Sequence, residues 1–496
     1  MGVRLKMSEV DEYIREVVEK GDEGSKLLAA RTAPTLKNSP LVRIVREGMN
    51  GIAVLDIPED CCVIVHSCTG DPKAENLKEH AFSLVEKLIT DVDLIEASSI
   101  AFVNVIDSST GDLKLLEEIA EGLVEGANRY SLAIMNGENA ILGNRITKGA
   151  NISGTMISIM HTDTARKKFG DFVTAKIFDK GPHRFAIFHP EGKPVYINSD
   201  GVGTKTEFYE RADRHSLALY DSLAMKLDDA AKLGAIPKVV SDVVEINEVI
   251  PFDFLESTAQ EIGFRELGIA YILHREIVGD RLRGYDDDVA VYNISGSVVS
   301  VINEERLRNP PVPREGDFLV TVRGKPNPRS NGITDKRRVM VEMFGKMWHV
   351  TEVGKVFLNY LASPSTVLFP LFSKLLSEQV ATSVYHISGG AYNGKLARPL
   401  AQHNLFAKID NLFPPDWREL FFVGASFATP EMAYGKWPMG NDGFFTTRSP
   451  VSALETVKEF GLEGRVVGQL ETAKDGKTGA EITTFNGKRV YFNGKD

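Results

Sequence analysis

The pattern of apolar and polar positions predicts the same series of elements twice in the first three hundred residues. In the first series, alternating runs predict strands and amphipathic runs predict helices. The strands are expected at 62–67, 100–107, 131–136 and 155–160, and the helices at 80–95 and 113–130. This order predicts a mixed α/β (α+β) fold, in which helices cover each sheet.

Matching segments indicate that this series is duplicated. The tetrapeptide Asn-Ile-Ser-Gly occurs at Asn151–Gly154 and, 142 positions later, at Asn293–Gly296, each time beside an alternating strand pattern. Residues 80–107 also align without gaps on 215–242, where Asp107 of the first segment meets Asp242 of the second. Because the matches keep their order and nearly their spacing, we predict a repeated domain of about 140 residues.

Four parts of the chain follow from these patterns. They are a helical extension (1–39), a first copy (40–165), a second copy (166–303) and an unrelated third domain (304–496) that begins after a proline-rich linker. An exposed edge or face in each copy would be costly. We therefore expect the two copies to pack together as an internal pseudo-dimer, with further homodimerisation left open.

Composition and charge narrow the class of protein. The chain has 496 residues, of which 43% are hydrophobic and 25% charged, as in ordinary globular proteins. A net charge of −10 argues against nucleic acid or an anionic membrane as the main partner. No run approaches the roughly 18 apolar residues of a membrane span, the N-terminus does not read as a signal peptide, and Cys61, Cys62 and Cys68 lack zinc spacing. We expect a cytoplasmic protein with reduced thiols.

The stretch "VYINSDGVGTKTEF" is the first candidate for chemistry. Gly201 and Gly203 would let backbone N–H groups approach a phosphate chain, followed by Thr204 and by Lys205 as an exposed point charge. Asp200 could hold a cation. The order of residues is not that of a Walker A loop, and a plain turn whose threonine caps the next helix is the alternative.

Two further sets of residues are candidates. Carboxylates suit Mg²⁺, and the candidate ligands are Asp200, Asp228, Asp229 and Asp242, with solvated helix acids as the alternative. Turns rich in Gly, Ser and Asn in the third domain suit an anion such as a ribose phosphate, against ordinary turn chemistry. Their candidate residues are Arg329, Ser330, Asn331, Gly332, Ser388, Gly389 and Gly390. We interpret His80 and His215 as structural, and we find no partner for His161, His274 or His386.

Several motifs together resemble those of the aminoimidazole ribonucleotide (AIR) synthetases, also called phosphoribosylformylglycinamidine cyclo-ligases, and their ATP-binding superfamily. They are "SDGVGTK", "MKLDDAAKLGAIPKVVSD", "SNGIT", "SGGAYNGK", "LFPP" and "EMAYGKWPMG". The resemblance implies two tandem AIR-synthetase N-terminal-like domains and one C-terminal-like domain. It also implies ATP and Mg²⁺ as cofactors and a small phosphorylated metabolite as substrate.

The two copies depart from the family pattern in complementary ways. The first copy keeps Gly137 and Glu138 of the family's Gly-Gly-Glu-Thr-Ala segment but lacks the Asp-Gly-Val-Gly-Thr-Lys loop, which only the second copy has. The resemblance thus implies one composite ATP site, in which Glu138 and Asn139 face the second copy's loop. The opposite cleft, with Cys68, Thr69 and Arg275, would be degenerate.

The resemblance implies a cyclo-ligase of purine biosynthesis. Such an enzyme uses ATP to convert formylglycinamidine ribonucleotide to aminoimidazole ribonucleotide, with release of ADP and phosphate. Asp200, Lys205 and Asp228 are the expected catalytic residues. The alternatives are another ATP-dependent member of the superfamily, of the thiamine phosphate kinase, selenophosphate synthase or hydrogenase-maturation type, and a nucleotide-binding scaffold without turnover.

Overall fold

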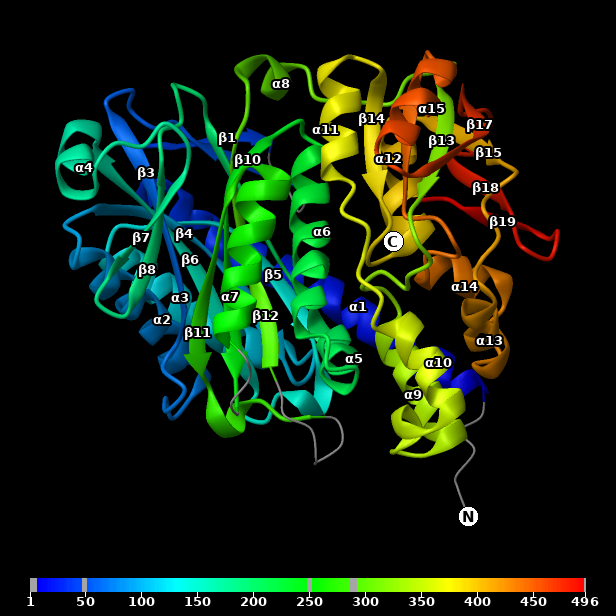
Figure 1. Ribbon diagram of the computed structural model, residues 1–496, viewed down its shortest axis with the longest axis horizontal. Helices are drawn as coiled ribbons and strands as arrows, with labels where there is room; N and C mark the ends of the chain where they lie inside the picture. Colours follow the sequence, from blue (N-terminus) through cyan, green and yellow to red (C-terminus); the bar gives the residue numbers. More distant parts are fainter. Residues whose placement is uncertain (1–6, 47–50, 248–251, 285–291, 495–496) are drawn as a thin grey trace. The chain divides into compact units, whose positions relative to one another are not determined.

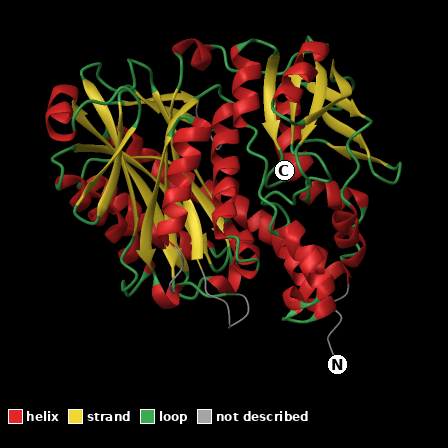
Figure 2. Cartoon of the chain, in the orientation of Figure 1, coloured by secondary structure: helices red, strands yellow, loops and turns green. Residues whose placement is uncertain are grey.

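The computed structural model describes residues 7–46, 51–247, 252–284 and 292–494, with side chains from residue 20 onward (Figure 1). The chain divides into two compact units. Unit 1 comprises Met1–Thr206 and Pro237–Glu304, and unit 2 comprises Glu207–Ile236 and Glu305–Asp496. Both units combine strands and helices (Figure 2), as the alternating patterns predict. Among the described residues, none of the helices has the length and apolar character needed to cross a membrane.

Unit 1 contains two six-stranded sheets with the same internal order. Sheet A runs β1-β2-β9-β12-β10-β11, and sheet B runs β7-β8-β3-β6-β4-β5. The strands of sheet A are β1 (Val42–Arg46), β2 (Ile52–Leu55), β9 (Val195–Gly201), β12 (Tyr292–Val301), β10 (Ile236–Ile246) and β11 (Ala270–Ile277). Those of sheet B are β7 (Lys176–Lys180), β8 (His183–Phe188), β3 (Cys61–Thr69), β6 (Ala150–His161), β4 (Ser98–Ser108) and β5 (Ala133–Ile141).

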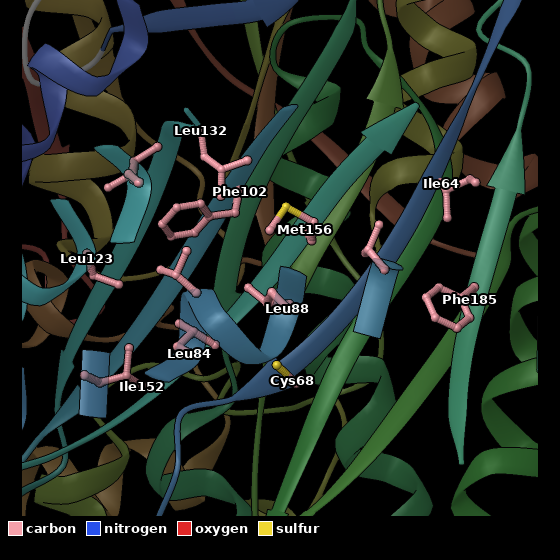
Figure 3. Close-up of a cluster of buried hydrophobic side chains, with 14 of the residues drawn as sticks. Ile64, Cys68, Leu84, Leu88, Phe102, Leu123, Leu132, Ile152, Met156 and Phe185 are labelled. Atoms are coloured by element: carbon pink, nitrogen blue, oxygen red, sulfur yellow. The ribbon is translucent and has the colours of Figure 1, made fainter. Parts of the chain in front are cut away.

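The elements predicted for the first copy are all present. Strands β3, β4, β5 and β6 cover the expected runs, and the helices of unit 1 are α1 (Met7–Thr32), α2 (Leu77–Asp93), α3 (Leu113–Arg129), α4 (Thr162–Phe169) and α7 (Phe252–Glu261). The apolar faces of α2 and α3 cover one face of sheet B, where Leu84, Leu123 and Phe102 belong to one buried cluster (Figure 3). Such burial of amphipathic helices on a sheet is the main source of stability in an α/β layer.

A hairpin is exchanged between the two copies. Hairpin β1–β2 precedes the first copy's strands, yet it joins sheet A, where Leu55 pairs with Val195 of β9. Hairpin β7–β8 precedes the second copy's strands, yet it joins sheet B, where Phe188 pairs with Val63 of β3. Each sheet is therefore completed by the segment that leads into the other copy.

The two sheets pack against each other through one apolar cluster that includes side chains from both. Polar residues at equivalent repeat positions meet inside this contact. The hydroxyl of Ser153 lies 2.8 Å from that of Ser295, and the hydroxyl of Thr155 donates to that of Ser297 over 2.9 Å. Both pairs are separated by the 142 positions of the repeat, so each residue touches its own counterpart.

One detail of the predicted repeat alignment is wrong. Gly154 pairs with Asn104 in sheet B, whereas a Cβ on Gly296 would lie 2.3 Å from an oxygen of Asp242 in sheet A. The counterpart of Asp242 is therefore Asn104 and not Asp107. The two strands are offset by three residues relative to the ungapped alignment, since β4 begins at Ser98 and β10 begins 138 positions later, at Ile236.

Unit 2 is built on a seven-stranded sheet in the order β14-β16-β13-β17-β15-β18-β19. Its strands are β13 (Phe318–Arg323), which is the strand predicted to open the third domain, β14 (Ala381–His386), β15 (Leu405–Ile409), β16 (Gly443–Thr447), β17 (Glu463–Thr472), β18 (Gly479–Thr483) and β19 (Arg489–Phe492). Helix α6 (Ala218–Ala231), the repeat counterpart of α2, groups with this unit and packs on α11 and β14. The other helices are α9 (Ile333–Phe344), α10 (Glu352–Leu361), α11 (Phe369–Ser377), α12 (Arg398–Gln402), α13 (Trp417–Ala425), α14 (Pro430–Lys436) and α15 (Pro450–Glu459). Two short helices, α5 (Thr206–Arg211) and α8 (Glu304–Arg308), lie at the points of the sequence where one unit passes into the other.

Candidate functional site

The glycine-rich loop follows strand β9 in unit 1. Gly203 has φ +63°, a conformation that favours glycine, whereas Gly201 has an extended backbone. A Cβ on Gly201 would meet nothing nearer than the carbonyl oxygen of Ile294 at 3.4 Å, an ordinary contact. Neither backbone conformation nor internal packing therefore requires glycine at 201, and the close approach of a ligand is one remaining reason for it.

The lysine of this loop differs from the expectation. Lys205 is fully buried, so the interpretation of an exposed point charge is wrong, and Thr204 is 8% exposed. The loop tightens into a turn of 3-10 helix over Gly203–Lys205, and the Thr206 hydroxyl donates to the Gly203 carbonyl over 3.0 Å. A buried ammonium needs compensation by charge or hydrogen bonds, so Lys205 contributes to the structure of the loop as well as to its charge.

Arg145 of the first copy holds the loop of the second. Its guanidinium donates to the Thr206 hydroxyl over 2.7 Å and to the Tyr292 carbonyl over 2.8 Å, and the side chain is 1% exposed. A Cβ on Gly203 would lie 3.6 Å from Leu142, three positions before Arg145. Segments of both copies thus meet at the glycine-rich loop.

Strand β5 carries Glu138 and Asn139, the two residues expected to complete this site. Strand β5 packs on β9, and consecutive side chains of a strand point to opposite faces. Glu138 pairs with Val105, next to the inward-facing Val103, whereas the Asn139 amide lies 3.2 Å from where a Cβ on Gly24 of α1 would be. The structure therefore places Glu138 on the face toward sheet A and Asn139 on the opposite face.

A buried group of acids and amides lies beside the loop in unit 1. Asn293 donates to Asp107 over 2.6 Å and to Glu245 over 3.3 Å, and Asn151 donates to the same Glu245 oxygen over 3.3 Å. Burial is the main cause that raises the pKa of Asp107 to about 6 and that of Glu245 to about 8. Asp200 also contributes to the raised pKa of Asp107, so this group is electrostatically coupled to the candidate site.

The four candidate metal ligands are divided between the units. Asp200 and Asp242 belong to unit 1, where the Tyr271 hydroxyl donates to Asp242 over 2.8 Å and Asp200 accepts the N–H of Gly201 over 2.7 Å. Asp228 and Asp229 belong to unit 2. Asp242 is fully buried, whereas Asp200 is partly exposed at the end of β9.

Asp228 makes the contacts of a structural anchor. One of its oxygens accepts the N–H groups of Leu368 and Phe369, both over 2.8 Å, at the start of α11. The other faces the Arg329 guanidinium over 3.2 Å, and both side chains are fully buried. A carboxylate at a helix N-terminus satisfies N–H groups that lack partners within the helix and is favoured by the helix dipole.

Asp229 lies on the same helix in a different network. It forms an ion pair with Lys232, and its carboxylate is 3.3 Å from Nε2 of His386. Although burial opposes ionisation, Lys232, Lys395 and His386 hold the pKa of Asp229 well below its usual range. His386 is also 3.0 Å from the Ser388 hydroxyl, so the expectation that this histidine has no partner is wrong.

The substrate-binding candidates of the third domain come together in unit 2. Asn331 donates to the Ser388 carbonyl over 2.9 Å, and Arg329 donates to the Ile387 carbonyl over 2.6 Å. Gly389 has open space where a side chain would be. The turns 329–332 and 388–390, which are distant in the sequence, therefore form one local structure.

Within these turns, Arg329 and Gly332 have clear structural roles. Arg329 is fully buried, and its guanidinium also donates to the Thr366 carbonyl over 3.1 Å. Gly332 has φ +62°, and a Cβ there would lie 1.9 Å from the Trp437 indole nitrogen. The tryptophan of "GKWPMG" is thus accommodated by the glycine of "SNGIT". The Ser330 hydroxyl is buried and has no hydrogen-bond partner among the described residues.

Sequence reasoning missed Arg145 and the roles of Asn151 and Asn293. The two asparagines carried a signal, because they begin the repeated Asn-Ile-Ser-Gly motif. Arg145 carried none, since a lone arginine in a loop is usually exposed. His274 was also missed: it is buried, and its Nε2 lies 3.0 Å from the Ser241 hydroxyl.

Comparison with known proteins places part of the chain in a described class. Residues 50–160 match the family model described as AIR synthase related protein, N-terminal domain. The resemblance to AIR synthetases recognised in the sequence is thereby confirmed. The match lies in the first copy and includes β2, whereas the loop motif lies in the second.

Curated relatives carry the name phosphoribosylformylglycinamidine cyclo-ligase. The protein of Methanococcus vannielii is 25% identical over 314 residues, which are 60% of this chain and 85% of the relative. That of Brevibacillus brevis is 25% identical over 293 residues, 57% of this chain and 82% of the relative. That of a Streptococcus pyogenes strain is 28% identical over 221 residues, 44% of this chain and 63% of the relative.

Solved structures show a distant likeness. Thiamine-monophosphate kinase from Stenotrophomonas maltophilia has a TM-score of 0.42 at 14% identity, and the likeness covers 60% of this chain and 86% of that chain. T. maritima PurL complexed with FGAR has a TM-score of 0.40 at 14% identity, over 64% and 47% of the two chains.

Proposed function

We propose that this protein is an ATP-dependent cyclo-ligase that converts formylglycinamidine ribonucleotide to aminoimidazole ribonucleotide, with release of ADP and phosphate. The observation that carries the proposal is the alignment with cyclo-ligases over as much as 85% of a relative's length. The order of motifs in the second copy and the third domain supports it.

The proposed nucleotide site lies in unit 1, where the two copies form an internal pseudo-dimer. Its loop comprises Gly201, Gly203, Thr204 and Lys205, and Glu138 comes from the other copy. Support comes from the contact of equivalent serines across the two sheets and from Arg145, which reaches from one copy to the loop of the other. Contact between equivalent positions is what packing about an approximate twofold axis produces.

The residues fit a phosphate chain with its cation. Gly201 leaves room beside the backbone, and Asp200 supplies a partly exposed carboxylate of the kind that Mg²⁺ prefers. When bound, Mg²⁺ would offset phosphate charge. We leave Asp228 and Asp229 out of the proposed metal site, because their carboxylates hold α11 and a lysine-histidine network.

The chain's own residues would act by positioning. The loop N–H groups and Lys205 would hold the phosphate chain of ATP. In the proposed reaction the amide oxygen of the substrate takes up the γ-phosphate and leaves with it when the neighbouring nitrogen closes the ring. Ser330, Asn331 and the backbone of Ser388–Gly390 would hold the ribose phosphate. Arg329, fixed on main-chain carbonyls, would position these turns rather than touch the substrate.

Binding of a nucleotide without turnover is the second candidate. It is favoured by Asp228, an expected catalytic residue whose two oxygens are engaged by backbone N–H groups and by Arg329. An enzyme in which this carboxylate is an anchor must do its chemistry with the remaining acids. The two candidates differ in whether ATP is consumed.

The test is an assay of the full chain with ATP, Mg²⁺ and formylglycinamidine ribonucleotide. We expect ADP to form only with this substrate, together with a product lighter by one water, measured by mass spectrometry. Gly201→Ala should lower kcat/KM for ATP at least about tenfold without loss of stability, since its Cβ makes no internal clash. The matched control is Gly424→Ala, whose Cβ meets nothing within 4 Å. ATP binding without ADP formation would favour the second candidate, and ADP formation with thiamine phosphate instead would favour a kinase.

A further inference from the structure

Three side chains with metal-ligand chemistry converge in unit 1, on elements that do not include the glycine-rich loop. They are His66 on β3, Asp91 on α2 and His183 on β8. Nε2 of His66 lies 2.9 Å from Oδ2 of Asp91, and Nδ1 of His183 lies 3.3 Å from the same oxygen. The side chains of His66 and Asp91 are 2% and 6% exposed, whereas that of His183 is 24% exposed.

Both ring nitrogens of His66 face an oxygen atom. Its Nδ1 lies 2.9 Å from the carbonyl oxygen of Arg184, which only accepts, so this nitrogen carries a proton. A neutral imidazole has a single N–H, and its Nε2 would then present a lone pair to the carboxylate of Asp91. A proton or a metal cation must therefore lie between Nε2 and the carboxylate oxygen.

The spacing of the three atoms suits a transition metal. Imidazole nitrogens and carboxylate oxygens lie about 2.0–2.2 Å from Zn²⁺, which sets neighbouring tetrahedral ligands roughly 3.3 Å apart. The two distances to Asp91 are 2.9 and 3.3 Å, and all three ligand atoms lie within 4.8 Å of one another. The bond from Nδ1 of His66 to a backbone carbonyl is the arrangement that orients histidine ligands in metal sites.

The cationic side chains around the cluster are themselves paired. Lys87 donates to both oxygens of Glu276 over 2.8 Å, and Arg184 forms ion pairs with Asp179 and Glu256. His274 lies edge-on to His66, with ring centroids 4.8 Å apart. Nε2 of His274 lies 3.0 Å from the Ser241 hydroxyl, so this nitrogen is not directed at Asp91. The cationic side chains nearby thus have partners other than Asp91.

We propose that His66, Asp91 and His183 bind a divalent first-row transition metal of the Zn²⁺ type, with a further position open to water on the side of His183. Two imidazoles and one carboxylate suit such metals and not Mg²⁺, which prefers oxygen ligands. The site belongs to one copy only, because the repeat places Asn198 opposite His66. It does not depend on the proposed cyclo-ligase activity.

The experiment uses the full chain, stripped with a chelator, dialysed and titrated with Zn²⁺, and with Co²⁺ as a spectroscopic probe. We expect one equivalent of tightly bound Zn²⁺ that excess Mg²⁺ does not displace, and a Co²⁺ visible absorption typical of nitrogen and oxygen ligands. His183→Ala, at a partly exposed position, should weaken Zn²⁺ binding roughly a hundredfold and abolish the Co²⁺ spectrum. Asp91→Asn should do the same.

The matched control is His161→Ala. His161 also faces a carboxylate, that of Asp60 at 3.4 Å, but both side chains are more than half exposed and neither belongs to a three-ligand cluster among the described residues. This variant should bind Zn²⁺ as the parent does. The proposal is overturned if the parent retains no stoichiometric Zn²⁺ after dialysis, or if His183→Ala retains as much as His161→Ala. The first result would leave His66 and Asp91 as a hydrogen-bonded pair without a metal.

Discussion

Replacement of Asp228 by asparagine should destabilise unit 2 rather than abolish metal binding. The substitution keeps an oxygen to accept the N–H groups of Leu368 and Phe369, but it removes the charge opposite Arg329. Both partners of this ion pair are fully buried, so solvent does not screen the loss. Breaking a buried pair costs about 3–5 kcal/mol, and the Asp442 carboxylate, 3.9 Å from Arg329, offsets part of it. We therefore expect Asp228→Asn to lower the free energy of unfolding by about 3 kcal/mol.

Asp228→Ala should cost more than Asp228→Asn. It also leaves the two N–H groups at the start of α11 without an acceptor, and hydrogen bonds to charged groups contribute about 1.5–3 kcal/mol each. The double variant Asp228→Asn, Arg329→Met should recover part of the loss, because no unpaired charge then remains buried. Recovery of stability in the double variant would show that the loss in Asp228→Asn comes from the broken ion pair and not from a general disturbance of helix α6.

Tryptophan fluorescence in urea is the appropriate assay, because the three tryptophans of the chain, Trp348, Trp417 and Trp437, all belong to unit 2. The control is Asp475→Asn, at an exposed position with φ +54° that asparagine adopts readily. It should change the free energy of unfolding by less than about 0.5 kcal/mol. If Asp228→Asn unfolds like this control but loses Mg²⁺-dependent ATP binding, Asp228 is a metal ligand and the anchor interpretation is refuted.

Three other outcomes are expected. Burial, followed by a neighbouring carboxylate, raises the pKa of Glu245 from 4.5 to about 8, so the folded protein keeps a proton that the unfolded chain releases. The stability of the folded protein should therefore fall as the pH rises from 4.5 to 8. Thermal melts followed by circular dichroism should show this fall, and Glu245→Gln should flatten it. Gly332→Ala should lower the melting temperature strongly, because its Cβ would overlap the Trp437 indole at positive φ; a melting temperature equal to that of the parent would contradict the described turn. Arg145→Met should weaken ATP binding roughly tenfold in calorimetry while the secondary structure is kept, since it frees the Thr206 end of the loop; unchanged affinity would separate this arginine from the site.

The sequence predicted the order of elements well, because hydrophobic periodicity reports which face of each element is buried. The duplicated segments and the strand at Phe318–Arg323 are examples. It could not predict that hairpin β1–β2 joins the second copy's strands, since a two-stranded pattern does not say which sheet edge it completes. Strand register was equally hidden, as the three-residue shift between Asp107 and Asp242 shows.

For the candidate site, sequence patterns predicted segments that could carry it but not the burial or the contacts of each side chain. The turns around Asn331 and Ser388 do meet, as their shared composition suggested. The burial of Lys205 and Arg329 could not be read from neighbouring residues, because charged side chains are rarely buried unless tertiary partners compensate them. Whether these residues bind ATP, Mg²⁺ or a ribose phosphate stays a prediction.

The exchanged hairpins constrain how this chain can fold and evolve. Strand β2 pairs with β9 at Leu55 and Val195, which are 140 positions apart, so sheet A cannot be completed until the second copy has been synthesised. Contacts of such sequence separation slow folding, since a long loop must close before they form. A gene fragment encoding 40–165 would contain β1 and β2 without their partner strand and would lack β7 and β8. The two halves of the duplication are thus no longer separable modules, and recombination or truncation between them would expose unpaired edges in both sheets.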